Sequence, residues 1–215
     1  MFDFNIPKML MTVPGILIGF TVHEFAHAYA AYRLGDETAK QDGRLTLNPM
    51  RHIDPIGFLL LMTAGFGWAK PVLFNPEALR NPKRDEILIS LAGPFSNLIL
   101  AFLSFGVVKL AIPFLPHPVP EILKNAVDIV VTGGFVNLGL CVFNMLPIPP
   151  LDGSHLYMVF LREKNWNLAQ QLSRFGMVAL LIVIVVENHS GLDILPIGKC
   201  VDFLASGMLR VLGLA

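Results

Sequence analysis

The chain has 215 residues, of which 54% are hydrophobic and 15% are charged, and its mean hydropathy is +0.62. A soluble domain carries about 25% charged residues, so this composition excludes an ordinary water-soluble protein and indicates a membrane protein. The 16 basic and 16 acidic residues cancel to zero net charge, and the basic residues are scattered, which excludes the basic patch that nucleic-acid binding requires.

The first apolar stretch runs from about Met9 to Leu34 and is long enough to cross a bilayer, which takes about 20 apolar residues as a helix. It resembles a signal peptide in position, yet it is too long and holds charged residues in its interior. We therefore expect it to stay in the mature protein. The next apolar run, 57–67, is too short to cross and predicts a re-entrant or interfacial segment.

Three further apolar stretches follow along the chain, at about 87–113, 126–147 and 175–186. The last of them is short but strongly apolar. Beyond Leu192 the chain is apolar to its end, which predicts either a fifth span or an interfacial helix. The sequence thus predicts an all-α integral membrane protein, a single domain over 1–215, with about five to six transmembrane helices.

The basic residues predict the orientation, because cytoplasmic loops carry an excess of Lys and Arg. Two connections, between the first and second spans and between the third and fourth, hold most of them: Arg33, Lys40, Arg44, Arg51, Lys70, Arg80, Lys83, Arg84, Arg162, Lys164 and Arg174. The opposite side receives only Lys8, Lys109, Lys124 and Lys199. The N-terminus is therefore expected outside the cell.

The first span contains the motif His23-Glu24-Phe25-Ala26-His27. On a helix, histidines four positions apart share one face and can bind one zinc ion, while Glu24 stands beside the metal. Zinc lowers the pKa of a bound water, and a nearby carboxylate can accept its proton. Ionisable groups are costly inside a membrane unless they pair, bind metal or meet water. The motif therefore predicts a zinc hydrolase.

A catalytic zinc takes three protein ligands and leaves the fourth position to water. The third long span ends in a segment that reaches Asp152-Gly153 on the inner side, and His23 and His27 lie late in a span that runs inward. Asp152 is therefore expected at the depth of the histidines and is the candidate third ligand. The alternative is an ordinary turn, since Asp-Gly is a common turn dipeptide.

Together, His-Glu-x-x-His in a first span and the Asn144–Gly153 segment, N-x-x-P-x-P-x-L-D-G, resemble the site-2 protease family of intramembrane metalloproteases. The segment 92–97, Ala-Gly-Pro-Phe-Ser-Asn, resembles a further motif of that family. The resemblance covers about 9–153, the expected catalytic core, with additional spans at about 168–213. It implies zinc bound by His23, His27 and Asp152.

The same resemblance implies that Glu24 is the catalytic base and that Asn144 holds the substrate backbone, which suits an amide that donates and accepts. Asn144 could instead satisfy backbone near a proline-broken helix end. The connections leave no room for PDZ or CBS domains, so a minimal form is expected, similar to compact bacterial and archaeal members. The expected substrates are transmembrane or membrane-associated proteins, in a multi-pass protein of the cell membrane.

The polar stretch 43–57 and the following 67–72 are expected to form an extended loop beside the site, as the resemblance implies, and segments 45–47 and 70–74 could offer a strand edge to a substrate. His52 and Asp54 could be further ligands, although a loop histidine is more often solvated. His117, His155 and His189 have no partner at metal-ligand spacing and are expected at the surface.

Two functions from other classes fit parts of this pattern. A membrane metal-binding or transport protein could use the histidines and Asp152 to hold a passing ion, but inverted repeats or ligands along a path would be expected. An inactive scaffold would have no need of Glu24. Hydrolysis accounts best for a glutamate between the two histidines.

Overall fold

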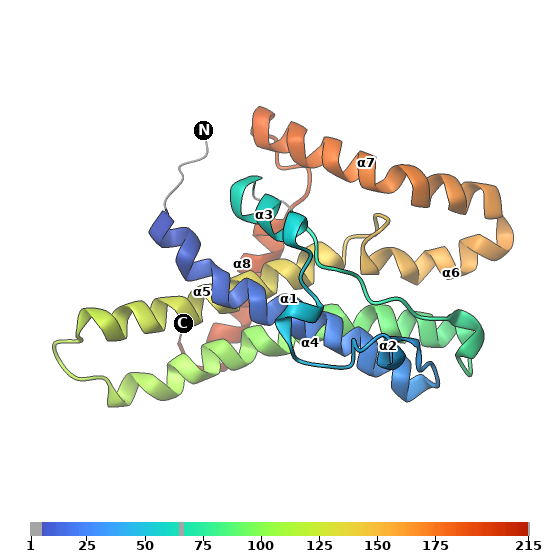
Figure 1. The fold of residues 1–215 in the computed structure, drawn as a ribbon. Coiled ribbons are helices and arrows are strands. Elements are labelled where there is room, and N and C mark those ends of the chain that lie inside the picture. The colour runs from blue at the N-terminus through green and yellow to red at the C-terminus, as the bar shows by residue number, and fades with distance from the viewer. Residues whose placement is uncertain (1–5, 65–66, 215) are drawn as a thin grey trace.

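A computed structural model describes residues 6–64 and 67–214 of the chain. Within these residues the secondary structure is helical, and the only β-type pairing is an isolated antiparallel bridge between Ile53 and Ala69 (Figure 1). The predicted all-α class is therefore confirmed.

Long helices make up most of the described chain. Their bounds are α1 (Ile6–Leu34), α4 (Pro82–Ala111), α5 (Glu121–Asn144) and α7 (Trp166–Ser190). The shorter elements are α2 (Thr38–Gln41), η1 (Pro49–Arg51), α3 (Pro55–Ala64), η2 (Pro76–Ala78), η3 (Ile112–Phe114), η4 (Asp152–Ser154), α6 (His155–Lys164) and α8 (Ile197–Val211).

Three of the described helices are long and apolar enough to cross a membrane: Pro82–Phe114, Glu121–Asn144 and Trp166–Glu187. Helix α1 matches them in length but carries the His-Glu-x-x-His motif. Helix α8 has 15 residues and so spans about 22 Å, which is short of the roughly 30 Å hydrocarbon core. The chain is thus a membrane protein, and the described part confirms three candidate spans of the predicted five to six.

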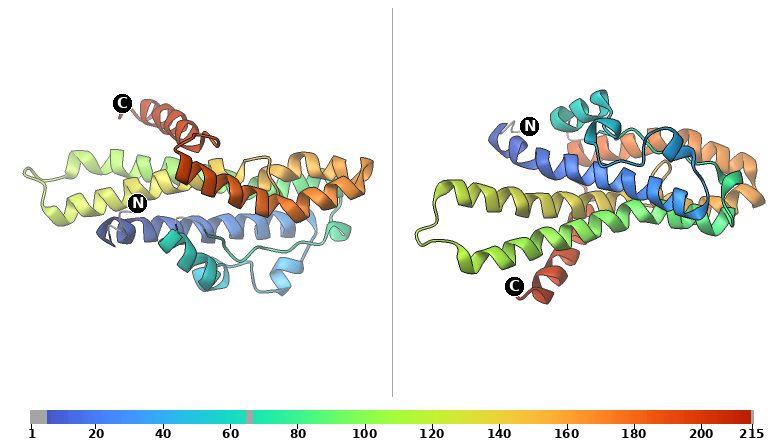
Figure 2. Two further views of the ribbon diagram at one scale, coloured as in Figure 1. Left: turned by 90° about the horizontal axis from the view of Figure 1, so that it is seen from above. Right: turned by 60° about the horizontal axis from the view of Figure 1, so that its bottom comes forward.

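Helices α1, α4 and α5 pack together as a core, with α8 crossing the α4–α5 pair on the side away from α1 (Figures 1 and 2). Small residues let α1 and α5 approach closely. A Cβ atom added to Gly15 would lie 2.7 Å from the Cα of Gly133, and one added to Gly19 would lie 2.9 Å from the Asn137 side chain. Such contacts are typical of membrane helices, which gain little from the hydrophobic effect between themselves.

Helices α6 and α7 form a second layer, in which α6 packs directly on α4 and α7 contacts the chain after α5 (Figure 1). A Cβ atom on Gly176 of α7 would lie 2.3 Å from the carbonyl oxygen of Pro149, so only a glycine allows this contact. Helix α7 therefore packs against the segment that leads to Asp152.

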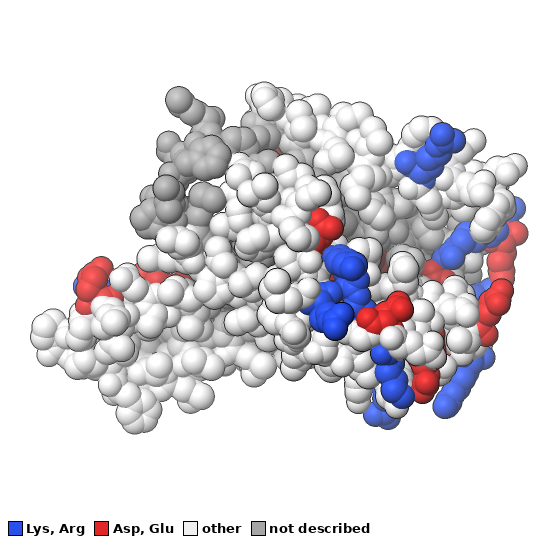
Figure 3. Space-filling model, viewed as in Figure 1, with Lys and Arg blue, Asp and Glu red and all other residues white. Residues whose placement is uncertain are grey.

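Charged side chains on the face shown in Figure 3 gather toward the end that holds α2 and the start of α4. A small charged group marks the opposite tip, at the turn between α4 and α5, and the broad region between is uncharged. This distribution is the one expected of helices that cross a bilayer lengthwise, with their basic loops at one end.

Candidate active site

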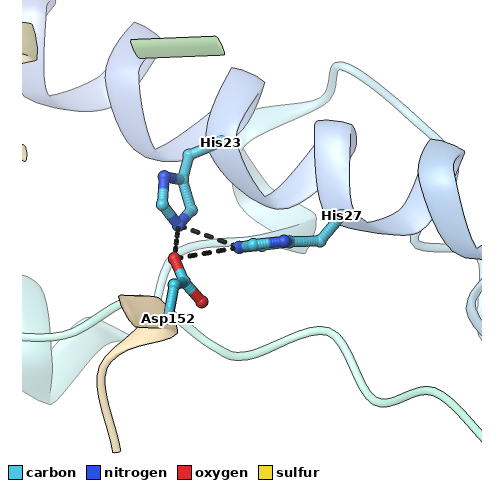
Figure 4. A group of neighbouring side chains, drawn as sticks. All are labelled: His23, His27 and Asp152. Atoms are coloured by element: carbon cyan, nitrogen blue, oxygen red, sulfur yellow. Dashed lines mark hydrogen bonds and ion pairs between the residues drawn. The ribbon is translucent and has the colours of Figure 1, made fainter. Parts of the chain in front are cut away.

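The structure brings His23, His27 and Asp152 together in a cluster of potential metal ligands (Figure 4). The histidines come from successive turns of α1, and Asp152 begins η4. Asp152 Oδ2 lies 3.1 Å from His23 Nε2 and 3.4 Å from His27 Nε2, and the two Nε2 atoms are 3.0 Å apart. Both histidine side chains are buried.

The outer nitrogens of both imidazoles have acceptor partners. His27 Nδ1 lies 2.7 Å from the carbonyl oxygen of Ile89, a group that can only accept. His23 Nδ1 lies 2.6 Å from Asn97 Oδ1. The Asn97 amide nitrogen donates to the carbonyl oxygen of Gly19 and to Asn137 Oδ1, which fixes its oxygen toward His23. Both rings therefore carry their proton on Nδ1.

It follows that each Nε2 presents a lone pair to the centre of the cluster when the rings are neutral. Asp152 Oδ2 is buried there without a hydrogen-bond donor, although both Nε2 atoms are close. Three electron-rich atoms facing one another repel unless a cation lies between them. Ligand atoms 2.0–2.1 Å from a tetrahedral zinc ion would be about 3.3 Å apart. The observed 3.0 to 3.4 Å fits that ion.

Two glycines make room for this cluster. A Cβ atom on Gly93 of α4 would lie 2.4 Å from His27 Nε2 and 2.6 Å from His23 Cε1. A Cβ atom on Gly153 would lie 2.2 Å from the Met145 carbonyl oxygen, so the chain after α5 folds back tightly.

Glu24 lies beside the cluster but does not belong to it. The residue is 8% exposed, and its Oε2 accepts a hydrogen bond of 3.0 Å from the backbone N–H of Val72. Glu24 lines the same cavity as both histidines and Asp152. A carboxylate in this place can receive a proton from a water at the cluster without binding the metal itself.

Comparisons with known proteins agree with this geometry. A profile of Peptidase family M50 matches residues 121–184. YwhC of Bacillus subtilis, named as a candidate zinc metalloprotease, is 38% identical over 184 residues, which are 86% of this chain and 83% of YwhC. The chain belongs to peptidase family M50. Rip2 of Mycobacterium tuberculosis, named in the same way, is 30% identical over 85% of this chain and 69% of Rip2. No solved structure matches.

Membership of family M50, together with the two-histidine, one-aspartate cluster and the apolar helices, makes this chain a zinc metallopeptidase of the membrane. Its substrates are accordingly proteins. The resemblance to the site-2 proteases is thereby confirmed at the level of the family.

The M50 site opens into a cavity of about 1100 Å³ between α1, α5, α7 and the segment 67–74. Away from the metal cluster its wall is mostly apolar, with Ile16, Phe20, Val136, Leu140, Met177, Leu180 and Ile184. Asn144, the last residue of α5, also lines it, and its amide nitrogen donates to the Leu140 carbonyl oxygen at 2.9 Å.

His52 and Asp54 lie outside the metal cluster. His52 is fully buried, and its Nε2 lies 2.7 Å from the carbonyl oxygen of Thr46. The expectation of a solvated histidine was therefore wrong: the loop folds over this ring. Asp54 accepts a hydrogen bond from the Gly57 N–H, which caps the start of α3. Both residues hold the loop in shape.

His155, expected at the surface, instead lines the cavity. Its Nδ1 lies 2.8 Å from Glu86 Oε1, and Glu86 is almost completely buried near the start of α4. The sequence analysis did not single out Glu86, because the predicted span begins at 87, and so missed this pair. The available signal was the position of His155, one helical turn after Asp152.

Proposed function

We propose that this chain cleaves membrane-embedded or membrane-associated proteins within or beside the bilayer, with a zinc ion held by His23, His27 and Asp152. The observation that carries the proposal is the convergence of three lone-pair atoms at zinc spacing, with Glu24 beside them in a mostly apolar cavity. Bound zinc would supply a water of lowered pKa and polarise the scissile carbonyl.

Glu24 is the proposed general base. Its carboxylate accepts the proton of the attacking water and returns it to the nitrogen of the leaving amine. The hydrogen bond from Val72 keeps the Glu24 carboxylate turned toward the cavity. Asn144 is proposed to bind the substrate backbone: its Nδ2 is engaged by Leu140, which leaves Oδ1 to accept a substrate N–H.

The proposed architecture is one domain over 1–215, with α1, α4, α5 and α7 as spans and the N-terminus outside. In this topology the charged end in Figure 3 is the inner one. Helix α8 is too short to cross and is amphipathic: Ala205 packs on α4 and α5, whereas Lys199, Asp202 and Arg210 are exposed. It suits the outer interface. Helix α3 and the chain beside it form the proposed membrane-associated loop.

A test of the reaction uses Glu24→Gln, which keeps the size of the side chain and removes its basicity. The purified protein is incubated with a panel of single-span peptides, and products are identified by mass spectrometry. We expect zinc content to be unchanged and cleavage to fall by about 10²- to 10⁴-fold. Glu163→Gln is the matched control, because Glu163 is exposed and pairs with Lys83.

Either of two results would overturn the proposal. A zinc-loaded wild-type protein that cuts no peptide of the panel would exclude the activity. Wild-type cleavage by Glu24→Gln would exclude Glu24 as the base.

A further inference from the structure

Beyond the metal cluster, a second group of polar side chains meets the cavity through His155. Glu86 Oε1 accepts from His155 Nδ1 at 2.8 Å and also pairs with Arg162. The Glu86 side chain is 4% exposed, whereas those of His155 and Arg162 are 31% and 33% exposed. Glu86 thus joins the start of α4 to His155 and Arg162 of α6. Of these three residues, His155 alone lines the cavity.

The charge balance of this group indicates that His155 is neutral and that its Nε2 can accept a hydrogen bond. Arg162 already neutralises the buried Glu86 carboxylate, so a neutral imidazole leaves no uncompensated buried charge. An ionised Glu86 carboxylate can accept a hydrogen bond but cannot donate one. The His155 nitrogen that faces it, Nδ1, therefore carries the proton. The ring's other nitrogen, Nε2, has no hydrogen-bond partner within the described chain, and it carries a lone pair.

An extended peptide in this cavity would lack hydrogen-bond partners for much of its main chain. It presents an N–H and a C=O at every residue, while most of the cavity wall is apolar. Each amide left without a hydrogen-bond partner there weakens the binding of the peptide. At the metal cluster, the polar side chains that line the cavity in addition to the proposed ligands include Glu24, Asn144 and His155. Glu24 is the proposed general base, which leaves Asn144 and His155 to bind the main chain.

We infer that His155 is a substrate-binding residue whose Nε2 accepts a main-chain N–H of the extended substrate, while Glu86 holds the ring in place. The inference rests on the proposed function, since it names how the same cavity receives its peptide. His155 follows Asp152 by one helical turn, so the contact lies next to the metal cluster. His155 acts on binding and takes no part in the proton transfer.

Two substitutions separate the cavity nitrogen from the Glu86 contact. By bond count, the amide of His155→Asn reaches the place of Nδ1, so this variant keeps the Glu86 hydrogen bond and lacks a group at Nε2. The amide of His155→Gln reaches the place of Nε2 and can present either an acceptor or a donor there. Neither change touches the Glu86–Arg162 pair. His117→Asn, in the exposed loop between α4 and α5, is the matched control.

The experiment measures KM, kcat and zinc content for these variants with a single-span peptide that the wild type cuts. Affinity for the peptide is measured separately by fluorescence anisotropy, with each variant placed in the Glu24→Gln background. We expect His155→Asn to raise KM and Kd about tenfold with kcat and zinc content unchanged. His155→Gln should recover most of that loss.

Equal behaviour of the Asn and Gln variants would overturn the inference, as would recovery by Asn and not by Gln, since the Glu86 contact would then be the one that matters. A fall in kcat at constant KM, or a loss of zinc, would also overturn it. A wild type that cuts no peptide would instead refute the proposed function, so the two failures are distinguishable.

Discussion

Replacing Asn97 by Ala removes the hydrogen-bond acceptor of His23 Nδ1 and leaves all three proposed metal ligands in the chain. Asn97 is fully buried, and its Oδ1 lies 2.6 Å from His23 Nδ1. Partners of this kind orient a metal-binding imidazole and raise its basicity, and their loss typically costs 10- to 100-fold in metal affinity. For Asn97→Ala we therefore expect zinc to bind about 10- to 100-fold more weakly, or about 1.4–2.7 kcal/mol.

The matched control is Asn137→Ala. Asn137 belongs to the same buried network, where its Oδ1 accepts from Asn97 and its Nδ2 donates to the Gly133 carbonyl oxygen, but it does not touch His23. Both variants leave buried polar groups without partners, so both should lower the unfolding temperature. Only Asn97→Ala should also lower zinc affinity, measured by competition with a chromophoric chelator in detergent. Equal zinc affinities for the two variants would refute the reasoning.

Two further predictions concern the third ligand and the topology. Asp152→Ala should lose zinc as well as activity, because two histidines hold a catalytic ion poorly, and a wild-type zinc content measured by mass spectrometry would remove Asp152 from the ligand set. A reporter fused after Arg84 should behave as cytoplasmic and one fused near His117 as external, and the opposite pattern would reverse the proposed orientation.

The sequence predicts the interiors of the long helices well and their starts poorly. The run predicted from 87 begins at Pro82 in the structure, and that predicted from 175 begins at Trp166. In both cases the first turns are polar, so hydropathy does not detect them. The helix signals there are local: Pro82 stands at the first turn of α4, and Asn165 accepts from the Leu168 N–H at the start of α7.

The meeting of His23, His27 and Asp152 could be predicted because it depends only on depth. In the proposed topology one span runs inward to the histidines and another runs inward to Asp152, so alternation of the spans places them at one depth. Side-to-side contacts are different, because they depend on how each helix is rotated about its axis. For this reason the partners of His23 and His155, which are Asn97 and Glu86, could not be named from the sequence. Both partners are polar residues of α4.

Those unpredicted contacts share a helix. Glu86 holds His155, the Ile89 carbonyl accepts from His27, Gly93 gives both imidazoles their space, and Asn97 accepts from His23. The positions are three or four residues apart, so they form one stripe on α4, about 16 Å long. Helix α4 supplies no proposed ligand, yet this stripe touches the imidazoles of the cluster and the proposed substrate contact. Because the α4 backbone and its buried side chains are fixed by packing against α1 and α5, the imidazoles are oriented before metal or substrate arrives. Two of the four positions, Ile89 and Gly93, act through a backbone carbonyl and a missing Cβ atom, so no polar side chain marks them in the sequence and only their shared helix face shows their role.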